Sequence, residues 1–163
     1  MRTKQSLITF LFVLGCFVAV NAQSTYKAAI GLRLGYPTCV SFKYFLSEPG
    51  ALEAFAGFRG YGGYGYATVG AAYEHHFPIG SIEGFTWYVG GGAAIQFWNY
   101  DAVYGSDYAS TTFGVLGVGG VDYKFSSIPL NLSADVMPTF FIGDSYINSF
   151  QGLGALSARY TFK

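Results

Sequence analysis

Charged residues are scarce in this sequence. Only 11% of the 163 residues are Asp, Glu, Lys or Arg, whereas soluble domains average about 25%. Hydrophobic residues make up 52% and aromatic residues 20%, with 23 Gly, 14 Tyr and 16 Phe. A soluble protein this apolar would have to hide most of its surface, so the composition favours an apolar environment around the folded chain.

Cysteine is also scarce, with only Cys16 and Cys39. Cys16 lies in an N-terminal segment that we predict to be removed, and Cys39 by itself cannot form an intramolecular disulfide. Loss of Arg2 and Lys4 with that segment takes the nine Lys and Arg to seven against nine Asp and Glu, a net charge of −2. No basic patch is left, so we do not expect nucleic acid as a partner.

The longest apolar run lies at the N-terminus, over residues 7–20. Two basic residues precede it, and small residues at 20–22 form a cleavage motif. The run is shorter than the roughly 20 residues of a spanning helix and has no basic flank after it. We therefore predict a secretory signal peptide over 1–22, followed by a single domain over 23–163.

After residue 22 the sequence has neither sustained helical periodicity nor an apolar run of spanning length. It consists of short segments in which apolar and polar residues alternate, bounded by Gly, Pro, Ser and Asn, a pattern typical of β-strands. Most segments reach the roughly 9–11 residues of a tilted transmembrane strand. The expected strands are 27–35, 38–46, 52–60, 65–77, 85–98, 112–125, 130–142 and 152–162.

The two faces of these segments differ in chemistry. One face is apolar, as Leu156, Ala158, Tyr160 and Phe162 illustrate in the last segment. All charged residues well inside a strand take the opposite phase. An Arg or Lys that faces lipid costs about 2–4 kcal/mol at the bilayer centre, so a membrane barrel would place these residues in its lumen. The predicted lumenal charges are Arg33, Lys43, Glu53, Arg59, Glu74, Asp122, Lys124, Asp135 and Arg159.

Alternation alone does not say which face lies inside, because a soluble barrel or sandwich has the reverse polarity. The low charge, the signal peptide and the aromatic residues near strand ends favour a membrane barrel, in which aromatic rings mark the membrane–water interfaces. One predicted girdle contains Tyr44, Phe77, Phe85, Trp87, Phe125, Tyr160 and Phe162. The other contains Phe58, Tyr61, Tyr64, Phe97, Trp98, Phe113 and Phe140.

The connections between the strands form two sets. With a periplasmic N-terminus, the inner turns are 47–51, 78–84 and 126–129, and the outer loops are 35–38, 60–65, 99–111 and 143–151. The longest connection is then an outer loop, as in bacterial outer-membrane barrels. We predict an all-β, eight-stranded antiparallel up-and-down barrel in which the last strand closes onto residues 28–34.

Three stretches resemble a known family: IGLRLGYPT at 30–38, WYVGGGA at 87–93 and ARYTF at 158–162. They are similar to the small eight-stranded outer-membrane β-barrels of Gram-negative bacteria, OmpA/OmpX-like in architecture, and the resemblance covers the whole mature chain. It implies a location in the outer membrane, contact with outer-membrane lipid, and a C-terminal signal at Tyr160 and Phe162 for the barrel-assembly machinery. It does not fix an activity, because the functions within this family vary.

The lumen of an eight-stranded barrel is just wide enough for side chains to fill. Because the predicted lumen holds both signs of charge, we expect ion pairs rather than an open pore. Folding the hairpins about their turns places Asp135 opposite Arg159 and Lys43 diagonally near Glu53. The glycines expected to make room for the long side chains are Gly90, Gly92, Gly114 and Gly120.

We predict no catalytic, cofactor-binding or metal site. His75 and His76 are neighbours on a strand and point to opposite faces, so they cannot chelate one metal together. Glu74 and His76 share the lumenal face, which is a weak acid–base feature and is more simply a polar pair near an inner turn. Catalysis would also need a nucleophile and a base within reach of each other.

Loop 99–111 is the main functional candidate. It interleaves Tyr100, Tyr104 and Tyr108 with Asp101 and Asp107, and tyrosine rings offer rigid amphipathic area for contact with an extracellular protein or glycan. A solvated loop without a role is the alternative. We expect an outer-membrane barrel with a structural or adhesion-like surface role; the alternatives are a small channel or permeability protein, and a secreted lipocalin-like binder of small molecules.

Overall fold

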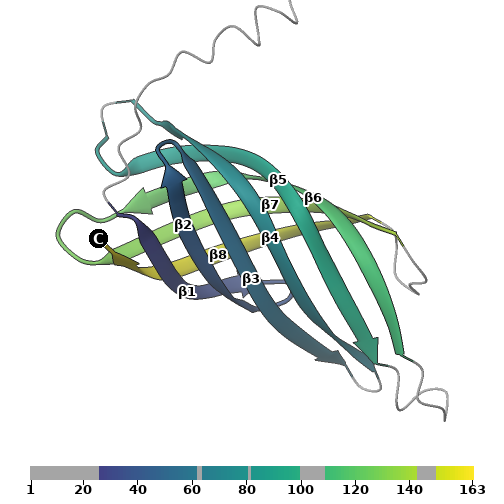
Figure 1. Ribbon diagram of the computed structural model, residues 1–163. Coiled ribbons are helices and arrows are strands. Elements are labelled where there is room, and N and C mark those ends of the chain that lie inside the picture. The colour runs from purple at the N-terminus through teal and green to yellow at the C-terminus, as the bar shows by residue number, and fades with distance from the viewer. Residues whose placement is uncertain (1–25, 62–63, 81, 100–108, 143–149) are drawn as a thin grey trace, which may run out of the picture.

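The computed structural model describes residues 26–61, 64–80, 82–99, 109–142 and 150–163 (Figure 1). The predicted signal peptide lies outside the described residues. No described helix has the length and hydropathy to span a membrane. The strands are β1 (Ala28–Gly35), β2 (Cys39–Ser47), β3 (Gly50–Tyr61), β4 (Tyr64–Pro78), β5 (Phe85–Asn99), β6 (Ala109–Lys124), β7 (Leu130–Ile142) and β8 (Phe150–Phe162).

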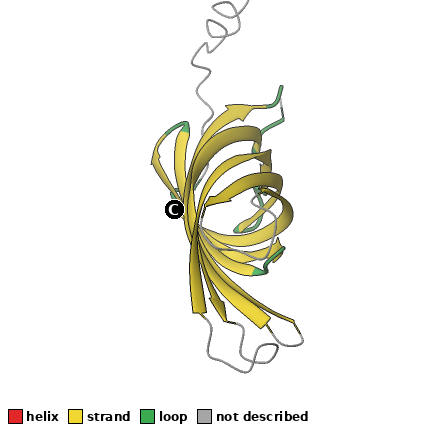
Figure 2. Cartoon of the chain, turned by 90° about the vertical axis from the view of Figure 1, so that its right-hand side faces the viewer, coloured by secondary structure: helices red, strands yellow, loops and turns green. Residues whose placement is uncertain are grey.

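The eight strands form one closed antiparallel barrel in sequence order (Figure 2). The seam runs from Ala28 opposite Phe162 to Gly35 opposite Ala155, so β1 is paired with β8 along the whole length of β1. Closure matters because it leaves no sheet edge with unpaired backbone groups, which the hydrocarbon of a membrane could not satisfy. The predicted fold class and the predicted seam are both confirmed.

Several strands extend beyond their predicted ends. β3 begins at Gly50 rather than 52, β6 at Ala109 rather than 112 and β8 at Phe150 rather than 152. The added residues lack a clear apolar alternation, but each has a partner on the next strand, as Ala109 has in Asn99. In a closed sheet the hydrogen-bond ladder continues for as long as the neighbouring strand does, whatever the side chains.

The barrel is apolar outside and polar inside. Phe58, Val115 and Leu156 are 81%, 65% and 64% exposed, while seven of the nine predicted lumenal charges are buried. All predicted outward residues that the structure describes are exposed or half-buried. A soluble barrel would have the opposite arrangement, so this surface is suited to the hydrocarbon of a membrane.

Aromatic side chains gather near both ends of the barrel. We call the end with the β2–β3, β4–β5 and β6–β7 connections the turn end, and the opposite one the loop end. Phe77 stacks on Trp87 at the turn end, with ring centroids 4.4 Å apart. The side chains of Tyr61 and Tyr64, predicted for the other girdle, lie outside the described part of the structure.

Trp98 was wrongly predicted as a girdle residue. It is only 2% exposed and packs inside the barrel against Tyr66, with ring centroids 4.5 Å apart. Its phase is that of Gln96, which also points inward. The prediction followed the aromatic character at the strand end, whereas the phase of the strand decides the direction of a side chain.

The lumen has two regions. On the loop-end side, large apolar side chains from several strands fill it, including Phe55, Leu116, Met137 and Phe141, all at most 8% exposed. On the turn-end side lies a cluster of charged and polar groups. Both regions are packed with side chains, and the polar one contains seven of the nine predicted charges.

Candidate functional site

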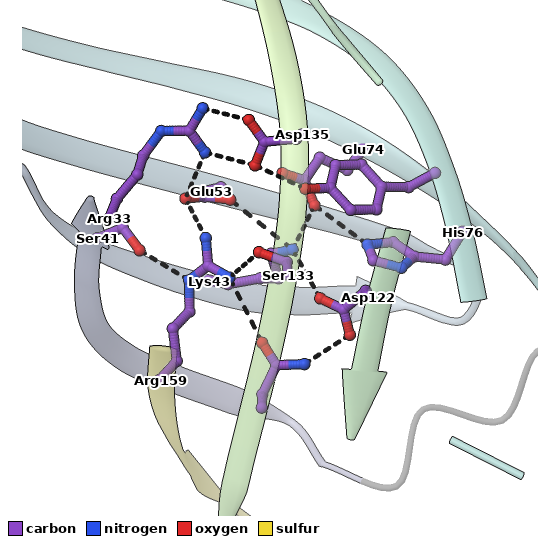
Figure 3. A network of polar contacts seen from close by, with 12 residues as sticks. Arg33, Ser41, Lys43, Glu53, Glu74, His76, Asp122, Ser133, Asp135 and Arg159 are labelled. Atoms are coloured by element: carbon purple, nitrogen blue, oxygen red, sulfur yellow. Dashed lines mark hydrogen bonds and ion pairs between the residues drawn. The ribbon is translucent and has the colours of Figure 1, made fainter. Parts of the chain in front are cut away.

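Seven of the nine predicted lumenal charges lie together inside the barrel (Figure 3). Each comes from a different strand and points inward because it lies on the lumenal phase of that strand. Tyr88 adds the remaining strand, β5, so all eight strands contribute to one network. The seven charges are Arg33 (β1), Lys43 (β2), Glu53 (β3), Glu74 (β4), Asp122 (β6), Asp135 (β7) and Arg159 (β8).

Arg159 joins β8 to the strands across the lumen. Its Nη2 lies 2.6 Å from Oε1 of Glu53, while Nε donates to Ser41 Oγ at 2.7 Å and Nη1 to Ser133 Oγ at 2.8 Å. The side chain is 0% exposed. The planar guanidinium presents its donors in fixed directions, so one Arg holds β2, β3 and β7 at the same time.

Lys43 is surrounded by carboxylates. Its Nζ lies 2.7 Å from Oε2 of Glu74, 3.3 Å from Oδ2 of Asp122 and 3.7 Å from Oε2 of Glu53. The ammonium also lies 4.5 Å from the centroid of the Tyr88 ring. The buried cation is therefore compensated on several sides, as a charge removed from water has to be.

Arg33 and Asp135 form a bidentate pair nearer the loop end. Arg33 Nη1 donates to Asp135 Oδ2 at 2.7 Å, and Nη2 donates to the second carboxylate oxygen. The Tyr88 hydroxyl donates to the same Oδ2 at 2.9 Å. Arg33 also reaches Glu53, at 3.8 Å, which connects this pair to the Arg159 side of the network.

His76 extends the network toward the turn end. Its Nε2 lies 3.1 Å from Oε2 of Glu74 and its Nδ1 3.1 Å from the Thr86 hydroxyl. The ring stacks on Tyr88, with centroids 4.9 Å apart. Both Glu74 and His76 are at most 2% exposed, so the pair predicted to share the lumenal face is packed into the network.

Comparison with known proteins yields structural matches only. No protein-family model matches the chain, and no curated protein does. The N-terminal β-barrel domain of Pseudomonas aeruginosa OprF superposes with a TM-score of 0.63 at 16% identity, over 83% of this chain and 95% of that one. Neisserial surface protein A gives 0.60 at 19% identity, over 83% and 93%. The fold is that of the small eight-stranded outer-membrane barrels.

In this outer-membrane barrel the predicted pairing of Asp135 with Arg159 is wrong. Asp135 lies opposite Ala155, and Arg159 opposite Asn131. The prediction centred the hairpin on residue 147, but Phe140 pairs with Phe150, which centres it on 145 and moves every partner by four positions. The actual ionic partner of Asp135 is Arg33, and that of Arg159 is Glu53.

Lys43 and Glu53 are directly opposite each other in the register, not diagonal as predicted. Two other predicted lumenal charges, Arg59 and Lys124, do not join the network. Arg59 lies over the Tyr36 ring at the loop end, 3.3 Å from its centroid, and Lys124 donates to backbone carbonyls at the turn end. Both are close to strand ends, where a long side chain can carry its charge out of the lumen.

The expected role of the glycines holds at Gly114, where a Cβ would come within 2.7 Å of the Phe141 ring. At Gly90 and Gly92 the reason is different. A Cβ there would come within 1.8 and 2.0 Å of carbonyl oxygens of the neighbouring strand β4. These glycines allow the backbones of two strands to approach closely; they do not make room for long side chains.

Several network members were not singled out from the sequence: Ser41, Thr86, Tyr88, Asn131 and Ser133. Each has a polar group on the lumenal phase of its strand, and this phase is the signal that could have identified them. The described residues include no group of three or more His, Cys, Asp or Glu arranged to hold a metal ion.

The remaining predicted sites are the C-terminal signal and loop 99–111. Tyr160 and Phe162 are on the lipid-facing side of β8, opposite Ile30 and Ala28 of the seam. The loop candidates Tyr100, Asp101, Tyr104, Asp107 and Tyr108 lie outside the described residues.

Proposed function

We propose that this protein is a side-chain-filled scaffold in the outer membrane of a Gram-negative bacterium, with a structural or surface-interaction role. The observation that carries the proposal is the burial of the network: Lys43, Glu53 and Arg159 are all 0% exposed at the level where a pore would have to pass. The barrel then acts by holding its outer loops at the cell surface, and we propose no enzymatic step.

The contacts of the network support a closed lumen. Arg159 and Lys43 are held by Glu53, Glu74 and Asp122 from other strands, at distances from 2.6 to 3.7 Å. Removal of one partner from such a buried pair costs about 3–5 kcal/mol, so these side chains do not move aside readily to open a water path. The small-channel alternative would need that movement, and a lipocalin-like binder would need an apolar cavity where the ions lie.

Conductance in a planar bilayer tests the closed lumen. We expect the wild-type barrel to give no single-channel steps at neutral pH. The double variant Glu53→Ala, Arg159→Ala removes one anion and one cation from the lumen and keeps the net charge. It opens the centre of the barrel, so it is the positive control that shows whether the measurement can detect a pore in a barrel of eight strands. Regular steps from the wild type would favour the channel instead.

Surface interaction is tested separately, on whole cells. We propose that Tyr100, Tyr104 and Tyr108, with Asp101 and Asp107, contact an extracellular protein or glycan. Cells that display the barrel with these three tyrosines changed to Ser should adhere less to immobilised extracellular protein or glycan than wild-type cells at equal surface amounts. Equal adhesion would leave only the structural role.

We further propose that Tyr160 and Phe162 form the signal read by the barrel-assembly machinery. Phe162→Ser should lower the amount of folded barrel in the membrane fraction. The free energy of unfolding of the same variant, refolded in vitro, should equal that of the wild type. The exposed Ile128→Ser, on a turn at the same end, is the control.

A further inference from the structure

A cleft of about 510 Å³ opens at the turn end, between the β6–β7 connection and the end of β8. Figure 1 shows these two segments together at the end of the barrel that carries the C-terminus. The polar wall of the cleft contains Lys124, Ser126 and Ser127. The other wall contains Tyr160, Phe162 and Lys163. This cleft is separate from the buried network described above.

The polar groups of the cleft are those that bind an anion. Lys124 donates to the carbonyl oxygens of Phe125 and Ile128, which fixes the ammonium and leaves its third N–H donor for a ligand. Ser126 and Ser127 are exposed and add hydroxyl donors. No Asp or Glu is among the described residues that line the cleft.

Tyr26 lies at the inner side of the cleft and adds no negative charge. Its side chain is 5% exposed, and burial raises the pKa of its hydroxyl well above the usual range. The two ammonium groups of Lys124 and Lys163 therefore dominate the side-chain charge of the cleft.

The apolar wall locates the cleft relative to the membrane. Tyr160 and Phe162 face outward, 54% and 45% exposed, with ring centroids 5.1 Å apart. Aromatic rings at strand ends mark the level of the lipid headgroups. The cleft therefore opens where lipid phosphates lie, with apolar surface on the membrane side and ammonium and hydroxyl groups on the water side.

We propose that the cleft binds the phosphate of a phospholipid of the inner leaflet of the outer membrane. Lys124 and Lys163 contact the phosphate oxygens, Ser126 and Ser127 donate to them, and the acyl chains follow Tyr160 and Phe162 into the bilayer. An anionic lipid such as phosphatidylglycerol is preferred, because each basic residue near a membrane surface attracts anionic lipid. The proposal rests on the membrane location and is independent of the role of the outer loops.

Native mass spectrometry tests this proposal on the full barrel released from vesicles of phosphatidylglycerol and phosphatidylcholine. Lys163→Gln should lower the retained phosphatidylglycerol about fivefold, the value for one basic residue at a membrane surface. Ser127→Asp should lower it further by repelling the phosphate. Both variants leave the Lys124 contacts with the turn in place, and heat-dependent gel mobility checks that each is folded.

Lys27→Gln is the matched control. It removes the same charge at the same end, but the Lys27 ammonium lies over the Tyr44 ring, 5.8 Å from its centroid, and does not line the cleft. Its lipid retention should equal that of the wild type. Equal retention in all variants, or an equal loss in Lys27→Gln, would overturn the proposal. Displacement of the lipid by inorganic phosphate at equal concentration would identify a free-phosphate site and overturn the lipid assignment.

Discussion

Arg159 illustrates how a single buried side chain connects distant strands. It lies 26 positions from Ser133, 106 from Glu53 and 118 from Ser41, yet contacts all three. Burial of an ion costs several kcal/mol, and this cost is met only when every charge and donor finds a partner. Removal of one member of the network should therefore destabilise the barrel by more than the loss of its own contacts, because it leaves the other buried charges without a partner.

The first prediction concerns the partner of Arg159. Arg159→Leu should lower the free energy of unfolding by about 3–5 kcal/mol, because it leaves Glu53 buried without its closest cation. Urea unfolding of the barrel in lipid vesicles, followed by tryptophan fluorescence, measures the loss.

A double-mutant cycle identifies that partner. Glu53→Gln combined with Arg159→Leu should recover part of the stability, whereas Asp135→Asn combined with Arg159→Leu should show less coupling, since Asp135 pairs with Arg33. Stronger coupling to Asp135 than to Glu53 would contradict the register of β7 and β8.

At the scale of the strand, neighbouring positions on the same strand meet different environments. Gly119 and Gly120 are adjacent on β6, but a Cβ at Gly120 would lie 2.5 Å from the Ala134 carbonyl oxygen, whereas one at Gly119 would be 3.8 Å from its nearest atom. The alternation of a strand gives the facing of each position, and the approach of the next strand decides how much space it has.

The second prediction uses this pair of glycines. Gly120→Ala should lower the free energy of unfolding by about 1–3 kcal/mol, because the backbone of β7 must shift. Gly119→Ala should be neutral or slightly stabilising, since alanine restricts the unfolded chain more than glycine does. The same urea titration compares the two, and an equal effect would contradict the inward facing of Gly120.

The third prediction tests the seam. Leu32 lies opposite Ala158, whereas Tyr160 lies opposite Ile30. With Cys39 changed to Ala, cysteines at 32 and 158 should form a disulfide on oxidation, because paired residues of antiparallel strands are within bridging distance. Cysteines at 32 and 160 should cross-link much less. Mass spectrometry of tryptic fragments measures the yield of both cross-links. Efficient cross-linking of 32 with 160 but not of 32 with 158 would mean that the register of the seam is shifted.

At the scale of the whole molecule, the inverted polarity decides the environment. An apolar exterior and a charged interior are stable only when lipid surrounds the barrel and the lumenal ions compensate one another. The fold shared with OprF and Neisserial surface protein A fits this arrangement.

The fourth prediction follows from that polarity. Val115 is 65% exposed near the middle of β6, so Val115→Arg should lower stability in vesicles by about 2–4 kcal/mol. Ser127→Arg, on an exposed turn, should have little effect. Tolerance of both substitutions would favour a soluble barrel, in which an exposed charge faces water.

The sequence by itself determined the strands, their facing, the closure of β8 onto β1 and the charged residues of the buried network, because these follow from a side-chain period of two and from the cost of a charge in lipid. Tertiary structure alone decided the ion pairs. Asp135 binds Arg33 rather than Arg159 because the β7–β8 register depends on where the chain turns, which alternation does not record. Arg59 stays outside the network because its long side chain, close to the end of β3, lies over the Tyr36 ring. The inward direction of Trp98, in contrast, already follows from the phase of β5.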